Sequence, residues 1–77
     1  MLESILVCRS LTYAQRTLRA LRAAGFRAEL TRLSAAEAGD GCGYGVRLRQ
    51  RDRAAALALL AGKNLAPRRV LEEERRM

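Results

Sequence analysis

The chain has 77 residues, a formal net charge of +7 and no histidine. This length makes one small domain, which buries only about 60% of its unfolded surface. The lack of histidine excludes Cys/His nucleophilic pairs and Cys-His zinc sites within one chain. Two cysteines are too few for a disulfide-stapled secreted scaffold. We therefore expect a cytoplasmic protein with reduced thiols, no targeting segment and no membrane span.

The first two predicted elements are a strand and a helix. Residues 3–8 form the strand, because an unbroken apolar run precedes Cys8. Ser10 and Thr12 are both candidates for the helix N-cap, and Thr12 with Gln15 fits a capping box. Gly25 is placed to end this helix. Its predicted apolar stripe consists of Leu11, Ala14, Leu18 and Leu21.

The second part of the chain alternates strand, turn and helix patterns. The predicted segments are a half-buried strand over residues 26–31, a loop over 33–41, a strand over 44–49, a helix over 51–61 ended by Gly62, and a short strand over 69–71.

The resulting order, βαββαβ, predicts an α+β fold. We expect a ferredoxin-like split βαβ sandwich with a four-stranded antiparallel sheet and both helices on one face. Residues 1–71 would form this single domain. Residues 72–77 would form a charged C-terminal tail that frays.

This topology would bring the two cysteines to one edge of the domain. The first and third strands are expected to be antiparallel neighbours, so Cys8, at the end of one, lies near Cys42, just before the other. A disulfide would require Cα atoms within about 7 Å. The same edge would hold the start of the first helix, whose unpaired N–H groups stabilise a thiolate. The groups expected to support the thiols are Arg9, Ser10, Thr12, Gly41 and Gly43.

Each of these residues also has a purely structural interpretation. Cys8 at a strand end is compatible with a small buried apolar residue, and Cys42 with an incidental loop cysteine. The glycines around Cys42 suit a tight turn with positive φ. Asp40, close in sequence to Cys42, would raise the pKa of a thiol rather than lower it.

The chain resembles the family of selenium/sulfur carrier-like proteins, a small domain family of otherwise unknown function. The likeness extends to about Val70, and its distinctive motif is Cys42-Gly43 before the third strand. The other matching pieces are residues 5–8, Ser10, Thr12, residues 24–26 and residues 56–60. The resemblance implies that Cys42 carries sulfur or selenium as a persulfide or selenopersulfide. It assigns no role to Cys8.

The leading hypothesis is therefore a non-enzymatic sulfur or selenium carrier. Cys42 would carry the cargo between donor and acceptor proteins, and Cys8 would act as the resolving thiol. We expect no catalytic residues, no cofactor and no resident metal.

Three alternatives stay open. Two thiolates suit a Cu(I) carrier, although the usual CxxC spacing is absent. A basic interaction module could form a homodimer through an apolar open sheet face around Leu6. Nucleic-acid binding through that face, with Arg27, Arg47 and Arg49, is least favoured, because the chain has few aromatic residues and its arginines are spread over every element.

Overall fold

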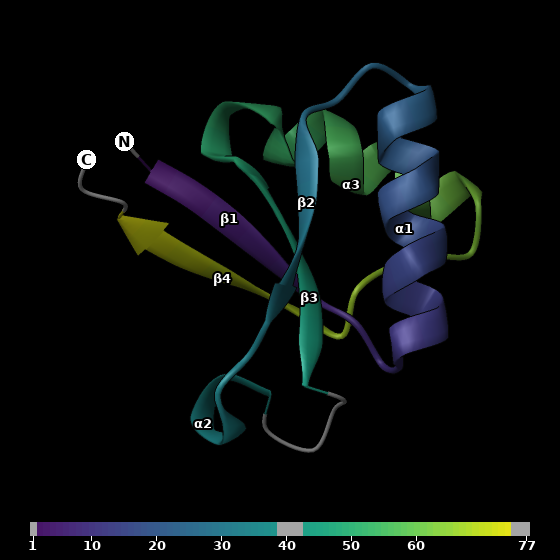
Figure 1. Ribbon diagram of the computed structural model, residues 1–77. Helices are drawn as coiled ribbons and strands as arrows, with labels where there is room; N and C mark the ends of the chain where they lie inside the picture. Colours follow the sequence, from purple (N-terminus) through teal and green to yellow (C-terminus); the bar gives the residue numbers. More distant parts are fainter. Residues whose placement is uncertain (1, 39–42, 75–77) are drawn as a thin grey trace.

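The computed structural model describes residues 2–38 and 43–74 (Figure 1). Within these residues the elements are β1 (Leu2–Val7), α1 (Leu11–Ala23), β2 (Ala28–Arg32), α2 (Ala35–Ala38), β3 (Tyr44–Arg49), a 3-10 turn η1 (Gln50–Asp52), α3 (Arg53–Gly62) and β4 (Arg69–Glu74). The four strands form one antiparallel sheet in the order β2-β3-β1-β4. The expected α+β class and four-stranded antiparallel sheet are confirmed, and a third helix is present that the sequence did not predict.

The strand order interleaves two β-α-β segments. β3 lies between β1 and β2, and it is antiparallel to both, so β1 and β2 are parallel to each other and joined by α1. In the same way β1 lies between β3 and β4, which are joined by α3. The predicted pairing of the first and third strands is confirmed, with Leu6 opposite Val46 and Val7 opposite Gly45.

Helix α1 begins at one of the two predicted caps. Ser10 has an extended backbone, and its hydroxyl accepts a hydrogen bond from the N–H of Tyr13 at 3.2 Å. The predicted Thr12–Gln15 capping box is wrong, because Thr12 already lies inside the first helical turn, with its side chain exposed. The serine is the cap because the helix begins at Leu11, so the first unsatisfied helical N–H groups fall just after Ser10.

Both long helices end in the same way. After α1, Gly25 adopts a φ of 92° and the N–H of Phe26 bonds to the carbonyl of Leu21 at 2.9 Å. After α3, Asn64 adopts a φ of 60° and the N–H of Leu65 bonds to the carbonyl of Leu60, also at 2.9 Å. These are Schellman ends, in which a left-handed residue turns the chain back over the last turn. Gly25 was predicted for this role, whereas asparagine takes it after α3.

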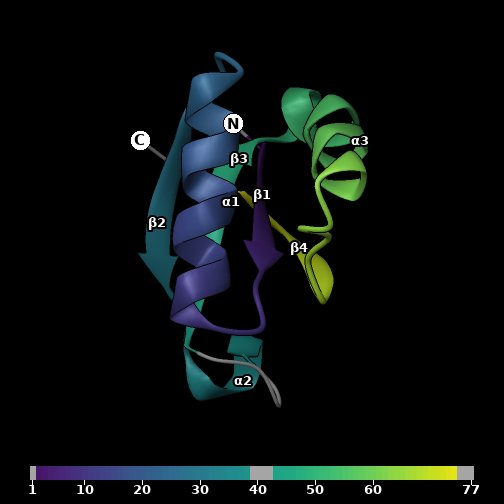
Figure 2. The same ribbon diagram turned by 90° about the vertical axis from the view of Figure 1, so that its right-hand side faces the viewer.

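Helices α1 and α3 share one core cluster with the strands, and Figure 2 shows α1 in front of the sheet with α3 to its right. This cluster consists of Leu6, Cys8, Ala14, Leu21, Ala28, Val46, Leu48, Ala56 and Leu60. The predicted stripe on α1 was partly wrong: Leu11 is 39% exposed, and the buried residues of the helix are Ala14, Thr17 and Leu21. Leu6 faces the helices, so it contributes nothing to an open sheet face.

The second face of the sheet is not an open apolar platform. Ile5 and Val7 project to this side, and both are buried against Leu33, with Leu71 packed beside them. Leu33 directly follows β2, and its N–H bonds to the Gly43 carbonyl at 2.7 Å, which continues the β2–β3 pairing by one residue beyond Arg32 and Tyr44. The premise for a homodimer through this face, an exposed apolar run on the first strand, is therefore removed.

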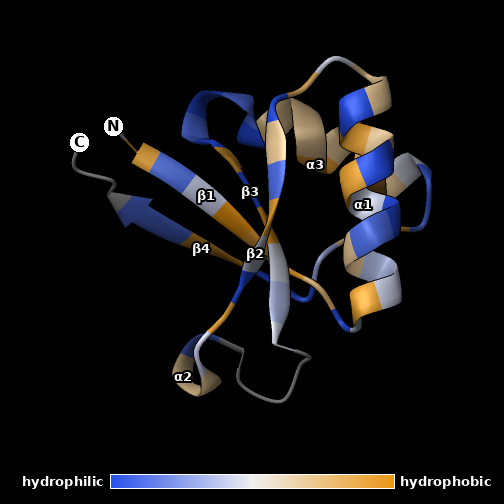
Figure 3. Ribbon diagram, in the orientation of Figure 1, coloured by the Kyte–Doolittle hydropathy of each residue, from blue (hydrophilic) through white to orange (hydrophobic). Residues whose placement is uncertain are grey.

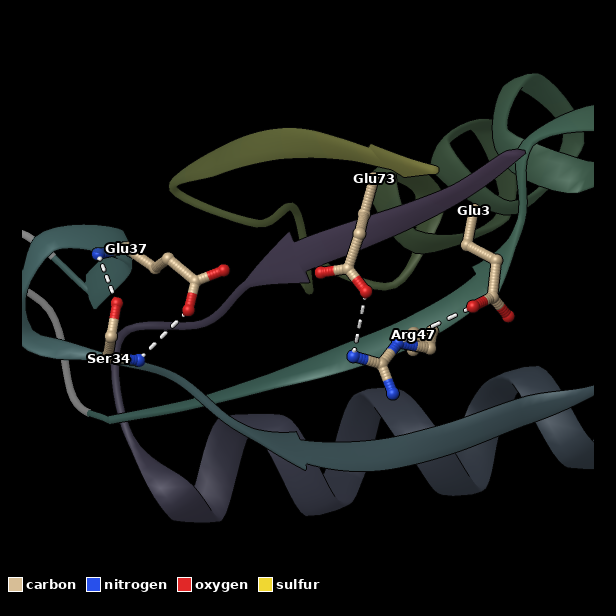
Figure 4. Close-up of polar contacts among 5 residues, drawn as sticks. All are labelled: Glu3, Ser34, Glu37, Arg47 and Glu73. Carbon is tan, nitrogen blue, oxygen red and sulfur yellow. Dashed lines mark hydrogen bonds and ion pairs between the residues drawn. The ribbon is translucent and has the colours of Figure 1, made fainter. Parts of the chain in front are cut away.

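The helix α2 lies where a loop was expected. Ser34 and Glu37 form a capping box: the N–H of Ser34 bonds to the Glu37 carboxylate at 3.0 Å, and the N–H of Glu37 bonds to the Ser34 hydroxyl at 3.2 Å (Figure 4). Arg69 of β4 also donates to the backbone carbonyls of Ala36 and Glu37. The S-x-x-E spacing of Ser34 and Glu37 is the signal that would have predicted this turn of helix.

Strand β4 continues to Glu74, beyond the predicted end at Leu71. Glu72, Glu73 and Glu74 pair with Ser4, Glu3 and Leu2 of β1 in sequence order. Three consecutive glutamates were expected to fray. They are held because Glu72 accepts a hydrogen bond from the buried Ser4 hydroxyl at 3.0 Å and forms an ion pair with Arg53.

Candidate thiol site

Cys8 lies at the end of β1, beside the start of β3. Its N–H donates to the carbonyl oxygen of Tyr44 at 3.4 Å, which continues the β1–β3 pairing past Val7 and Gly45. The side chain is only 3% exposed and belongs to the core beneath the helices. Its Sγ lies 3.5 Å from the carbonyl oxygen of Leu6. Cys8 therefore lies beside the first residue of β3, and its thiol is buried.

The partner thiol of the hypothesis, Cys42, and its neighbour Gly41 lie outside the described residues. Gly43 is described, and its carbonyl oxygen accepts a hydrogen bond from the N–H of Leu33 at 2.7 Å. A Cβ at Gly43 would lie 3.8 Å from the Leu33 carbonyl oxygen, an ordinary contact. Gly43 is thus fixed through its backbone, and sterics at this point do not demand a glycine.

Three residues predicted to support the thiols, Arg9, Ser10 and Thr12, lie around the start of α1. Arg9 is exposed, and its guanidinium carbon lies 4.7 Å from the ring centroid of Tyr13. This is a cation–π contact, which holds the positive charge over the first turn of α1. Ser10 caps that turn, whereas Thr12 makes no capping bond. Arg9 and Ser10 therefore both lie at the start of α1, and their role toward a thiol stays a prediction.

A second arginine–tyrosine contact lies at the same end of the sheet. The guanidinium carbon of Arg32, at the end of β2, is 5.9 Å from the ring centroid of Tyr44, at the start of β3. Arg32 and Tyr44 are also paired in register. This contact was not predicted, because it depends on strand pairing. The Arg9–Tyr13 contact has a sequence signal, the four-residue spacing across a helix start. Two arginines thus bring positive charge to the edge that carries Cys8.

The most buried charges belong to the other face of the sheet. Arg47 of β3 reaches Glu73 of β4 at 3.3 Å and Glu3 of β1 at 3.7 Å (Figure 4). The side chains of Arg47 and Glu3 are only 17% and 13% exposed. One guanidinium between two carboxylates on neighbouring strands is an arrangement that ties β3, β1 and β4 together. It gives a stabilising role to Arg47, which had been considered for nucleic-acid binding.

The carboxyl group of Glu37 is the one whose pKa departs clearly from its ordinary value among the described residues. The backbone N–H of Ser34 holds the pKa of Glu37 below its usual 4.5, and the Ser34 hydroxyl acts in the same direction. Both effects come from the capping box, because hydrogen bonds to a carboxylate favour its charged form. This group therefore serves local structure at α2.

Comparison with known proteins gives no relative. No family model, no curated protein and no solved structure matches the chain. Within residues 2–38 and 43–74, no helix has the length and apolar character needed to cross a membrane. The same residues contain no group of three or more His, Cys, Asp or Glu side chains arranged to hold a metal ion.

Proposed function

We propose that this protein is a thiol-based carrier of sulfur or selenium, with Cys42 as the carrying thiol and Cys8 as the resolving thiol. We also propose that its fold is the ferredoxin-like split βαβ sandwich. The strand order β2-β3-β1-β4 and the single core cluster shared by α1 and α3 support that classification.

The observation that carries the functional proposal is the hydrogen bond from Cys8 to Tyr44. It sets one thiol beside the first residue of β3, and Cys42 precedes that residue by two positions in the sequence. Two thiols at one edge suit a cycle in which one sulfur carries and the other resolves. Arg9 and Arg32, with the start of α1, supply positive charge that favours an anionic sulfur there.

The proposed cycle is a pair of thiol exchanges. In loading, the Cys42 thiolate attacks the outer sulfur of a donor persulfide, and the donor leaves as a thiolate. In unloading without an acceptor, the Cys8 thiolate attacks the inner sulfur of the Cys42 persulfide. The outer sulfur then leaves as hydrosulfide with the electron pair of the broken S–S bond, and a Cys8–Cys42 disulfide remains. A dithiol reductant restores the two thiols.

The burial of Cys8 fits this division of roles. A resolving thiol that is 3% exposed is shielded from external oxidants and thiols, so that only a sulfur in the same molecule would meet it readily. The carrying thiol must instead meet proteins that differ in shape. The carrier therefore needs one protected thiol and one accessible thiol.

The test is the intact mass of the protein purified anaerobically from cells of its own source, before and after treatment with a thiol reductant. We expect a reductant-labile mass increase of one sulfur or one selenium atom, absent in Cys42→Ser and retained in Cys8→Ser. Oxidation of the parent protein should produce a monomer that lacks two hydrogens. If Cys42→Ser holds as much labile sulfur or selenium as the parent protein, the carrier assignment is wrong.

A further inference from the structure

The outer side of α1 carries a row of arginines. Arg16, Arg19 and Arg22 are all exposed, on the side of the helix away from the buried Ala14 and Leu21. The sequence of α1, LTYAQRTLRALRA, contains no carboxylate. In Figure 2 this helix lies in front of the sheet, and Figure 3 shows hydrophilic bands recurring along it. We refer to Arg16, Arg19 and Arg22, together with Arg27 after the helix, as the basic ridge.

The charges of the basic ridge are not neutralised within the described part of the chain. Every ion pair between residues in the ranges 2–38 and 43–74 uses Arg47 or Arg53 with a glutamate of β1 or β4. In the ridge, Arg22 donates to the backbone carbonyl of Ala28 at 3.2 Å, which positions its guanidinium and leaves its charge in place. The described carboxylates lie on β1, β2, β4, α2 and η1, whereas α1 has none, so the outer side of α1 presents its positive charge without a carboxylate on the same helix.

A shallow pocket continues the basic ridge at the C-terminal end of α1. It has a volume of about 510 Å³ and is lined by Arg22 and Arg27 of the ridge, with Arg47 and Arg49 of β3. Glu3 and Glu29 also line it, and Glu3 forms an ion pair with Arg47. Four guanidinium groups against two carboxylates leave the pocket with an excess of positive charge. A chain of anionic groups lying along α1 would therefore meet a further attractive site at this end.

The spacing and composition of the ridge favour a particular polyanion. Arginines three positions apart follow one another at about 4.5 Å along the helix axis, a separation that long side chains can adapt to successive phosphates. The guanidinium group binds phosphate oxygens in a two-pronged geometry. A protein partner would be expected to need an apolar or aromatic anchor. Besides the arginines, the exposed residues of α1 are Leu11, Thr12, Gln15 and Ala23, and the one large apolar side chain among them, Leu11, lies at the start of the helix, away from Arg19 and Arg22.

We propose that the basic ridge binds the phosphodiester backbone of nucleic acid, without reading its sequence. None of the four ridge residues is aromatic, and the adjoining pocket contributes a single, half-buried ring, Phe26, so the contact is chiefly electrostatic. The sheet-face alternative considered from the sequence used Arg27, Arg47 and Arg49, whereas this surface is centred on Arg16, Arg19 and Arg22 of α1 and shares only Arg27 and the adjoining pocket with it. It also uses neither cysteine, so the proposal stands independently of the thiol-carrier function.

The experiment measures binding of fluorescein-labelled 20-nucleotide RNA, single-stranded DNA and duplex DNA by fluorescence anisotropy over a range of salt concentrations. With three or four phosphates contacted, log K should fall with log salt with a slope of about −2 to −3 for single strands and about −3 to −4 for a duplex. The three nucleic acids distinguish RNA from DNA as the source of the phosphates.

The decisive variant is Arg16→Gln/Arg19→Gln, with Arg51→Gln/Arg68→Gln as its matched control. Both double variants lower the net charge by the same amount at exposed positions. Near 50 mM salt we expect the ridge variant to bind RNA at least about tenfold more weakly than the parent protein. Its slope of log K against log salt for single strands should be smaller in magnitude by about 1.4, since two phosphate contacts are lost. Far-UV circular dichroism checks that α1 persists, as glutamine is a good helix former.

Several outcomes would overturn the proposal. Equal losses of RNA affinity in the two double variants would mean that binding depends on the net charge of the protein and not on the ridge. Competition by poly-glutamate as effective as that by RNA would indicate an acidic protein as the partner. A salt-independent interaction, or no binding at low salt, would exclude a phosphate-backbone surface. None of these results depends on Cys42, and a failed carrier test would leave the ridge proposal unchanged.

Discussion

The N–H of Cys8 donates a hydrogen bond to the carbonyl oxygen of Tyr44, so β1 and β3 remain paired one residue beyond the end of β1. The bond has two effects at once. It directs the Cys8 side chain into the core beneath the helices, and it holds the start of β3 against the end of β1. The edge proposed for sulfur chemistry is therefore also one end of the central strand pair, and changes there should affect both stability and reactivity.

The first prediction concerns the accessibility of Cys8. In a Cys42→Ser variant Cys8 is the remaining cysteine. Iodoacetamide should modify it slowly in the native protein and at the rate of an ordinary thiol in urea, because its side chain is 3% exposed. The reciprocal variant, Cys8→Ser, should react quickly without denaturant if Cys42 is the carrying thiol. Rapid native modification of Cys8 would contradict a protected resolving role.

The second prediction concerns the ion pairs of Arg47. Arg47→Met should lower the free energy of unfolding by about 1–3 kcal/mol, because Glu3 loses its cation while staying largely buried. This range already allows for the partial exposure of Glu73, the second partner of Arg47. Arg53→Met is the control, since the Arg53–Glu72 pair is more exposed, and it should cost less than about 1 kcal/mol. Urea unfolding measures both values. Similar losses of unfolding free energy in the two variants would show that the burial of the Arg47 ion pairs adds nothing to stability.

The third prediction concerns close packing at Gly45. A Cβ added there would lie 2.9 Å from the Leu6 carbonyl oxygen and 3.0 Å from Cγ2 of Ile5. Because backbone of the central strand cannot move aside cheaply, Gly45→Ala should destabilise the fold by about 1–3 kcal/mol. Gly62→Ala is the matched control: nothing lies within 4 Å of its Cβ position, and the change should be neutral or slightly stabilising. The melting temperatures of the two variants test this prediction, and an equal change in both would contradict it.

The fourth prediction is a pH dependence at α2. The pKa of Glu37 is lowered in the folded state, chiefly by the backbone N–H of Ser34. The contribution of this capping box to stability is therefore complete above the ordinary pKa of 4.5 and is lost as the pH falls through the lowered value. The NMR shift of the Ser34 amide proton should titrate with a midpoint below 4.5. In Glu37→Gln that titration should vanish, and a midpoint at or above 4.5 in the parent protein would contradict the contact.

Local patterns in the sequence were sufficient for most elements of the fold. Residues 44–49 were predicted as a strand from their alternation, and β3 has the same bounds. Gly25 was predicted as a helix end because glycine alone adopts positive φ without strain, and its φ is 92°. The prediction of secondary structure failed where residues distant in the chain hold a segment in place. Glu72 belongs to a strand because Ser4 and Arg53 bind its carboxylate, and neither partner is near it in sequence.

The candidate thiol site divides in the same way. The sequence alone determined that two cysteines exist without any histidine, and that Ser10 is a good cap for the helix that follows Cys8. It also placed β1 beside β3, since a split βαβ order leaves few other arrangements. The assignment of Cys42 as a carrier stays a prediction, because Cys42 lies outside the described residues.

Only the tertiary structure decided which side each residue faces and which charges meet. Periodicity indicates that a side of an element is apolar, but it does not indicate which partner covers that side. Leu6 therefore turned out to lie under the helices, while Leu33 covers Ile5 and Val7 on the other face. For the same reason arginines that look alike in the sequence differ in space: Arg47 and Arg53 pair with glutamates, whereas Arg16, Arg19 and Arg22 stay exposed along α1. Burial and ion pairing are relations between elements, and they are fixed only when the strands and helices pack together.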